Sequence, residues 1–353
     1  MERPNQEFDA SQQWHVKPKI DATQHPIAEF NARGGRDYSD YLDHQEYMAT
    51  DHPDVGEKNW EEIKAKLPEF EIIRDPISGQ KLRVQKFNWP EDKKVEDVPV
   101  TIITMPFSVP ISLDHIQYQH HLIAEELGGP VMVIENPSYG ASDKLTNSQK
   151  DALAVNDVKD GDYGPIADVM LGIMFSQGIN RINLIGYSMG AETAAAIAAN
   201  ARSIGTKVDN LLVMESPRVI DHDPLDLLIK FMSDASNLKF TWNHPIDPVL
   251  RKVAKIKPGL RGTLSYGRAM TRTGIAADLR QALSQQSDMN VTIASAGASK
   301  ISPSSANNEL REELKEEFPD HSINRVIIPG EGHAYGDSGK RFAFLARRVI
   351  NGL

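Results

Sequence analysis

Short apolar runs rich in valine and isoleucine recur along the chain from about residue 69 onward, and longer segments of helical periodicity separate them. Such runs are typical of strands buried on both faces of a parallel sheet, and their alternation with helices is typical of βαβ units. The pattern predicts an α/β fold with a mostly parallel sheet and flanking helices. The expected strands are 100–104, 131–134, 182–185, 211–214, 291–294 and 326–328, and the expected helices are about 112–127, 163–178, 190–202, 305–317 and 338–351.

A β-hairpin is expected before this series. Apolar and polar side chains alternate between residues 69 and 87 on both sides of a Pro-Ile-Ser-Gly turn, which brings the predicted sheet to eight strands. Residues 1–65 are polar, carry scattered aromatic side chains and show no clear periodicity, so we expect an irregular N-terminal arm.

One connection is too long for a simple crossover. About 75 residues separate Met214 from Val291, and they contain helix-like stretches at 225–232 and 273–283. We therefore expect a helical cap that is inserted into the α/β core. The expected boundaries are 1–65 for the arm, 66–217 and 290–353 for the core, and 218–289 for the cap.

Composition excludes several classes of function. The chain has no cysteine, which rules out disulfides, thiolate metal sites and a cysteine nucleophile. A formal net charge of −10 argues against broad nucleic-acid binding. No apolar run approaches the roughly 20 residues of a membrane span, and the N-terminal residues lack the apolar core of a secretory signal, so we expect a cytoplasmic protein. Neither a glycine-rich phosphate loop nor a metal-ligand pair is evident, and we predict no cofactor and no metal.

The sharpest motif is Gly186-Tyr187-Ser188-Met189-Gly190, which lies between an apolar strand and an alanine-rich helix. A Gly-x-Ser-x-Gly sequence in this setting places the serine on a strained turn, exposed above the sheet. Glycine is needed on both sides because a side chain there would collide with the neighbouring elements. Ser188 is therefore the predicted nucleophile.

A serine hydroxyl needs a neighbouring base before it can attack. His333 follows the last expected strand on a glycine-rich loop, Pro329-Gly330-Glu331-Gly332. In a parallel sheet that loop lies at the same carboxyl edge as the turn that carries Ser188. The order of nucleophile first and histidine last also matches this architecture, so we predict His333 as the general base.

At these residues the chain resembles the α/β-hydrolase superfamily, over roughly residues 69–353. The segment 134–143 is similar to the family's turn after the fourth strand, where a Pro-Gly-x-Gly-x-Ser pattern is usual and Ser138 here replaces the first glycine. The segment 104–108 takes the place of the family's oxyanion loop. The resemblance implies an oxyanion hole formed by the backbone N–H of Met189 and that of Phe107 or Ser108.

The third member of the triad departs from the family pattern. An aspartate commonly follows the seventh strand, but residues 296–303 contain no carboxylate. The family's alternative places the acid after the sixth strand, where Glu215 closes an apolar run. We predict that Glu215 orients His333, with a structural salt bridge as the competing interpretation. Weaker candidates lie in the expected cap: Asp221, Asp223 and Asp247.

Together these residues predict a serine hydrolase that cleaves the ester, thioester or amide bond of a small acyl substrate, with an esterase as the expected subclass. Two other interpretations stay open. One is a weakly active or inactive scaffold that binds a partner, and the other is a cofactor-free enzyme of the same fold, such as a haloperoxidase or a carbon–carbon hydrolase. Residues 251–272 carry seven basic side chains and no acidic one, which fits a solvated face, an anion site or, with the interleaved apolar residues, an acyl pocket.

Overall fold

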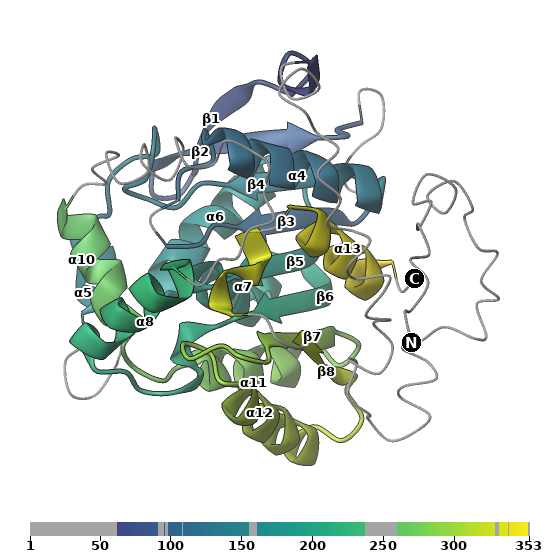
Figure 1. Cartoon of the computed structure of the whole chain (residues 1–353). Coiled ribbons are helices and arrows are strands. Elements are labelled where there is room, and N and C mark those ends of the chain that lie inside the picture. The colour runs from purple at the N-terminus through teal and green to yellow at the C-terminus, as the bar shows by residue number, and fades with distance from the viewer. Residues whose placement is uncertain are drawn as a thin grey trace, which may run out of the picture.

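An eight-stranded sheet forms the centre of the computed structural model (Figure 1), which describes residues 62–90, 95, 98–107, 109–154, 161–236, 260–328, 332–337 and 339–351. The strand order is β1-β2-β4-β3-β5-β6-β7-β8. β2 is antiparallel to both β1 and β4, and all the other neighbouring pairs are parallel. The predicted α/β fold with a mostly parallel sheet is confirmed. The strands are β1 (Phe70–Arg74), β2 (Lys81–Phe87), β3 (Val100–Thr104), β4 (Val131–Ile134), β5 (Arg181–Tyr187), β6 (Lys207–Met214), β7 (Asn290–Ala296) and β8 (Ile323–Ile328).

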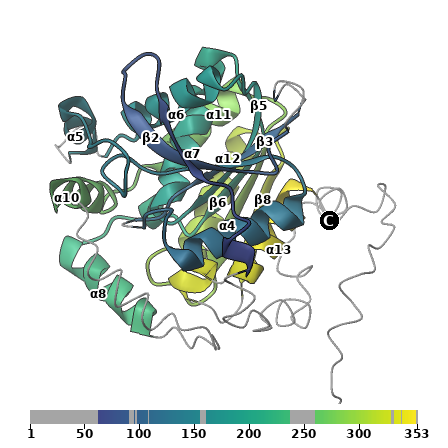
Figure 2. The same ribbon diagram turned by 90° about the horizontal axis from the view of Figure 1, so that it is seen from above.

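Helices cover both faces of the sheet because its strands are apolar on both sides. Successive strand residues point to opposite faces, so Leu184 joins one buried cluster and its neighbour Ile185 joins the other. α4 and α13 pack side by side over one face (Figures 1 and 2). Among the described residues, α6, α7, α11 and α12 cover the other face. The bounds of these helices are α4 (Asp114–Leu127), α13 (Gly339–Ile350), α6 (Gly164–Ser176), α7 (Met189–Asn200), α11 (Ile275–Gln285) and α12 (Ser304–Glu317).

Within the described residues, the connection between β6 and β7 contains the α-helices α8, α10 and α11. α11 packs against α7, and its buried residues Ile275 and Leu279 belong to the core. α8 and α10 lie beside the sheet rather than over its faces (Figures 1 and 2). The bounds are α8 (Pro224–Ser236) and α10 (Leu260–Ala269), and the remaining short elements are α5 (Asn147–Leu153), η5 (Ala201–Ile204), η6 (Pro217–Val219) and η7 (His333–Asp337).

The domain boundaries stay predictions. Most of the expected arm lies outside the described residues, and the few that are described include a short helical stretch at 62–64. Residues 251–259 of the basic stretch also lie outside the described part of the chain. Within the described ranges, no helix has the length and apolar character that crossing a bilayer requires.

Candidate active site

The turn between β5 and α7 holds Ser188 in an unusual conformation, with φ 55° and ψ −127°. The strand ends at Tyr187 and the helix begins at Met189, so the direction of the chain reverses within one residue. A Cβ on Gly186 would lie 2.4 Å from the carbonyl oxygen of Gly190, and a Cβ on Gly190 would lie 2.4 Å from that of Thr104. Both positions therefore require glycine, as the motif indicates.

Three side chains that follow β5, β6 and β8 form one hydrogen-bonded chain at the carboxyl edge of the sheet. The hydroxyl oxygen of Ser188 lies 3.0 Å from Nε2 of His333, and Nδ1 of that ring lies 2.9 Å from Oε2 of Glu215. All three residues are buried, with exposed fractions of 3%, 4% and 0%. The geometry allows the imidazole to accept the serine proton at Nε2 while the carboxylate accepts the Nδ1 hydrogen.

The carboxylate of Glu215 is held from behind as well. Its Oε1 accepts a hydrogen bond from the amide of Ala296, and its Oε2 accepts one from the Ser299 hydroxyl at 2.7 Å. Burial raises the pKa of this carboxyl above its ordinary value, while the hydrogen bonds from His333, Ser299 and Ala296 act in the opposite direction. The residues that contain no acid, 296–303, thus supply the donors that fix the acid in place.

Two aromatic rings fix the position of His333. The hydroxyl of Tyr187 donates to the His333 carbonyl at 2.8 Å, and its ring stacks on the imidazole with a centroid distance of 5.7 Å. Phe231 of α8 meets the imidazole edge-on at 5.3 Å. The β6–β7 connection therefore contributes a side chain directly to the surroundings of the imidazole.

Comparisons with known proteins agree with this geometry at the level of the fold. No family model matches the sequence, and no curated protein matches it either. An enol-lactonase from Burkholderia xenovorans, 12% identical, superposes with a TM-score of 0.57 over 78% of this chain and 98% of that chain. A bromoperoxidase from Bacillus anthracis, 13% identical, superposes with a TM-score of 0.55 over 80% of this chain and 100% of that chain. An esterase from Exiguobacterium antarcticum, 14% identical, superposes with a TM-score of 0.54 over 79% of this chain and 97% of that chain. The chain has the α/β-hydrolase fold.

In this α/β-hydrolase fold the loop after β3 lies against the start of α7, where an oxyanion hole is expected. The Thr104 hydroxyl donates to the Gly190 carbonyl at 2.6 Å, and Nδ2 of Asn136 donates to the Met105 carbonyl at 3.0 Å. Met189 is the first residue of α7, so its N–H has no partner within the helix. Phe107 is described and Ser108 lies outside the described residues, so the second donor stays a prediction.

The turn after β4 has a glycine-like backbone at the position where the α/β-hydrolase pattern usually has glycine. Ser138 has φ 70°, a value that favours glycine, and its hydroxyl accepts a hydrogen bond from the Leu145 amide at 2.9 Å. The amide of Ser138 donates to the Asp143 carbonyl at 2.8 Å. The serine therefore keeps the shape of the turn and adds a side-chain hydrogen bond.

The weaker acid candidates have other contacts. Asp223 accepts hydrogen bonds from the Leu225 and Asp226 amides at the start of α8, and Asp221 accepts one from the Thr273 amide. Asp247 lies outside the described residues. Among the described residues, Glu215 is thus the predicted acid that contacts the imidazole.

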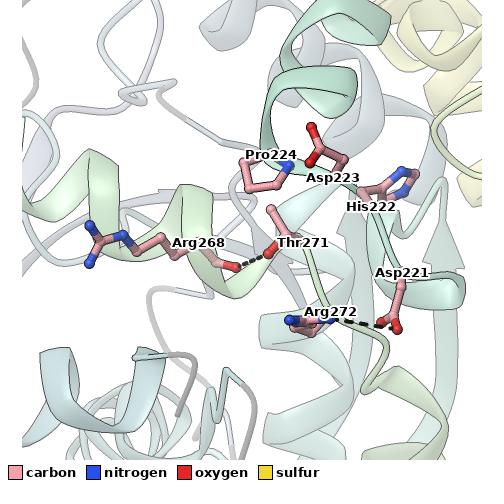
Figure 3. Close-up of a pocket in the computed structure, with 7 residues that line it drawn as sticks. All are labelled: Asp221, His222, Asp223, Pro224, Arg268, Thr271 and Arg272. Atoms are coloured by element: carbon pink, nitrogen blue, oxygen red, sulfur yellow. Dashed lines mark hydrogen bonds and ion pairs between the residues drawn. The ribbon is translucent and has the colours of Figure 1, made fainter. Parts of the chain in front are cut away.

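A pocket of about 400 Å³ lies between the start of α8 and the end of α10 with the residues that follow it (Figure 3). In Figure 3 the Arg268 side chain points away from the other labelled residues, and Asp221 pairs with Arg272 at 3.9 Å. No residue of the hydrogen-bonded chain lines this pocket, whose lining consists of Asp221, His222, Asp223, Pro224, Arg268, Thr271 and Arg272.

Tyr187 and Ser299 were missed as site residues by sequence reasoning. Tyr187 occupies a variable position of the Gly-x-Ser-x-Gly motif, and Ser299 lies in a stretch that attracts notice only for its lack of a carboxylate. The two hydroxyls of that stretch, Ser299 and Ser302, are the signal in the sequence for a donor to the displaced acid, and the sequence alone does not choose between them.

Proposed function

We propose that the protein is a serine hydrolase that cleaves an ester, or a thioester or amide, through an acyl-enzyme on Ser188. The observation that carries the proposal is the chain of contacts at 3.0 Å and 2.9 Å from Ser188 through His333 to Glu215. A nucleophile, a base and an orienting acid within hydrogen-bond reach are what acyl transfer requires.

In the first half-reaction the Ser188 oxygen attacks the substrate carbonyl carbon while Nε2 of His333 takes the hydroxyl proton. Backbone N–H groups of Met189 and the loop after β3 would stabilise the negative oxygen of the tetrahedral intermediate. The imidazolium then gives its proton to the leaving alcohol, thiol or amine as the bond to the carbonyl carbon breaks. Glu215 stabilises the imidazolium throughout and holds the tautomer that leaves Nε2 free to accept a proton.

In the second half-reaction a water molecule attacks the acyl-enzyme and His333 takes one of its protons. The intermediate collapses, the acid product leaves and the proton returns to the Ser188 oxygen, so the enzyme is regenerated without a cofactor.

The intact hydrogen-bonded chain supports an active hydrolase over an inactive binding scaffold. The substrate itself stays open, because structures with this fold include an enol-lactonase, a bromoperoxidase and an esterase. A small-molecule acyl substrate is the proposal that the buried site supports.

The test compares the wild type with Ser188→Ala. Purified protein is assayed with nitrophenyl esters of increasing acyl length and with a fluorophosphonate that labels activated serines. We expect the wild type to hydrolyse at least one ester and to be labelled, and the variant to lose at least about 10³-fold in kcat and all labelling. Ser203→Ala, at an exposed serine beyond the far end of α7, is the control and should match the wild type. Equal hydrolysis by Ser188→Ala would refute the proposal.

A further inference from the structure

A buried carboxylate that the proposed reaction does not use lies about one helical turn beyond Ser188. Glu192 is in the first turn of α7 and is fully buried. Its Oε1 accepts a hydrogen bond from the Ser216 hydroxyl, and its Oε2 lies 3.7 Å from Nη1 of Arg218. Burying charged groups is costly even when they are paired, and apolar side chains of similar size would avoid that cost.

Ser216 links this buried pair to the proposed acid, because it follows Glu215 directly in the chain. Its hydroxyl oxygen donates to Glu192 and accepts from the Arg218 amide at 3.1 Å. Glu215 itself has φ 53°, a backbone conformation that persists only where the surrounding structure holds it. Ser216 therefore attaches the strained loop after β6 that carries Glu215, which we call the acid loop, to α7, the helix that begins directly after Ser188.

Arg218 extends the same cluster to two further segments. Its Nη1 donates to the Gly161 carbonyl at 2.7 Å, and its Nε donates to the Arg272 carbonyl at 2.9 Å. The Gly274 amide donates back to the Arg218 carbonyl at 3.2 Å. A Cβ on Gly274 would lie 1.7 Å from the guanidinium, so the segment can approach this closely only with glycine there. The segment 272–274 leads directly into α11.

We propose that Glu192, Ser216 and Arg218 are positioning residues that hold Glu215 against His333. They also connect the acid loop to residues 272–274, which precede α11 in the β6–β7 connection. None of the three touches the reacting atoms. They act by fixing the distance between the acid loop and α7, the helix that begins directly after Ser188. This inference rests on the proposed function, because positioning matters only if Glu215 orients a working base.

The first test is the conservative change Ser216→Ala with Ser216→Thr as the rescue. Loss of the hydroxyl should let Glu215 move away from His333, and misplacement by about 1 Å costs on the order of 10²-fold in rate. We expect Ser216→Ala to lower kcat by about 10-fold to 100-fold with KM changed less than about twofold, and Ser216→Thr to restore most of kcat because threonine supplies the same hydroxyl. Unchanged kcat in Ser216→Ala would overturn the proposal.

The matched control is Gln286→Ala. Gln286 is also fully buried, and it links α7 to β6 at the ends far from Ser188 and Glu215. Its side chain accepts a hydrogen bond from the Val208 amide at 2.7 Å and donates one to the Ala198 carbonyl at 2.9 Å. It should lower the midpoint of thermal unfolding at least as much as Ser216→Ala and leave kcat near the wild-type value. If kcat falls equally in both variants, general destabilisation explains the effect and the positioning role is lost.

A second measurement separates this inference from the proposed function. The proton shared by Nδ1 of His333 and the Glu215 carboxylate is expected to give a far-downfield NMR resonance in the substrate-free protein, which does not depend on any assay. We expect this resonance to shift or broaden in Ser216→Ala and to persist in Gln286→Ala. If the wild type hydrolyses nothing, the proposed function fails while the NMR comparison still decides the positioning role. An unchanged resonance in Ser216→Ala would contradict that role.

A double-mutant cycle examines whether the cluster acts as a unit. Glu192→Ala and Ser216→Ala remove the two ends of one hydrogen bond, so the double variant should lose no more kcat than the more damaging single variant. Effects that multiply would mean that the two residues act independently, against the proposal.

Discussion

Ser188 and Glu215 both have a positive φ, 55° and 53°, in the range that favours glycine. Four described residues other than glycine have positive φ, and these two are the nucleophile and the acid of the proposed triad. Such conformations cost on the order of 1–3 kcal/mol each and tend to occur at functional sites. At the residue scale, two of the four strained residues are therefore ones that the proposed reaction uses.

The role of Glu215 can be tested by Glu215→Gln. The amide keeps the size of the side chain, but it removes the negative charge that stabilises the imidazolium and can favour the wrong tautomer of His333. We expect kcat for the best ester to fall by about 10²-fold to 10⁴-fold while fluorophosphonate labelling becomes slow rather than absent. An unchanged kcat would assign the orienting role to another residue or to none.

Gly190 provides a second prediction at this scale. A methyl group there would lie 2.4 Å from the Thr104 carbonyl oxygen, so Gly190→Ala must move α7 away from the loop after β3. We expect a loss of about 1–3 kcal/mol in the free energy of unfolding, measured with urea, and a marked loss of kcat. Gly129→Ala is the control, because a Cβ at Gly129 meets nothing within 4 Å, and it should change stability by less than about 0.5 kcal/mol.

At the scale of elements, the strands were predictable because each buried run is short, apolar and bounded by polar or glycine residues. The long helices were also found to within a few residues, including α7, whose alanines are strong helix formers. α5 was not predicted, since it is only seven residues long and depends on the capping box between Thr146 and Gln149. α10 was not predicted either, because it lies in the basic stretch and contains two glycines, Gly262 and Gly267, which are poor helix formers.

The site was predictable where chain order and the sheet edge were sufficient. Ser188 and His333 follow from a motif and from strand order, whereas Glu215 was predicted from the alternative acid position that the α/β-hydrolase resemblance implies. The cluster of Glu192 and Arg218 could not be predicted, because the sequence does not show which buried charges meet across 26 positions. A lone glutamate in the alanine-rich run after Ser188 is the only hint.

The packing of α7 makes a prediction for a whole element. α7 packs on β5 and β6 and contacts both α6 and α11, and Ala198 is fully buried there. Ala198→Leu adds three carbon atoms to a filled space, and we expect it to lower the free energy of unfolding by about 1–3 kcal/mol. Ala277→Leu on α11 is exposed and should stay within about 0.5 kcal/mol of the wild type. Equal stability of the two variants in urea would show that α7 is less tightly packed than the structure indicates.

At the scale of the whole molecule, the buried pair should make stability depend on pH near neutrality. Burial raises the pKa of Glu192 from 4.5 to about 7, although Arg218 and Ser216 act to lower it. The folded chain therefore binds this proton more tightly than the unfolded chain. By linkage, the contribution of Glu192 to stability is fully present below about pH 4.5 and is lost as the pH rises through about 7.

Glu192→Gln isolates this contribution, because glutamine does not titrate. The free energy of unfolding of both proteins would be measured with urea at intervals from pH 4.5 to 8. We expect the wild type to lose stability relative to the variant across this range, by up to about 3 kcal/mol. Asp278, whose pKa burial raises to about 6, is present in both proteins and changes stability in the same direction, so only its coupling to Glu192 remains in the difference. Two parallel curves would mean that Glu192 keeps an ordinary pKa, and that the interaction with Arg218 outweighs the cost of burying its charge.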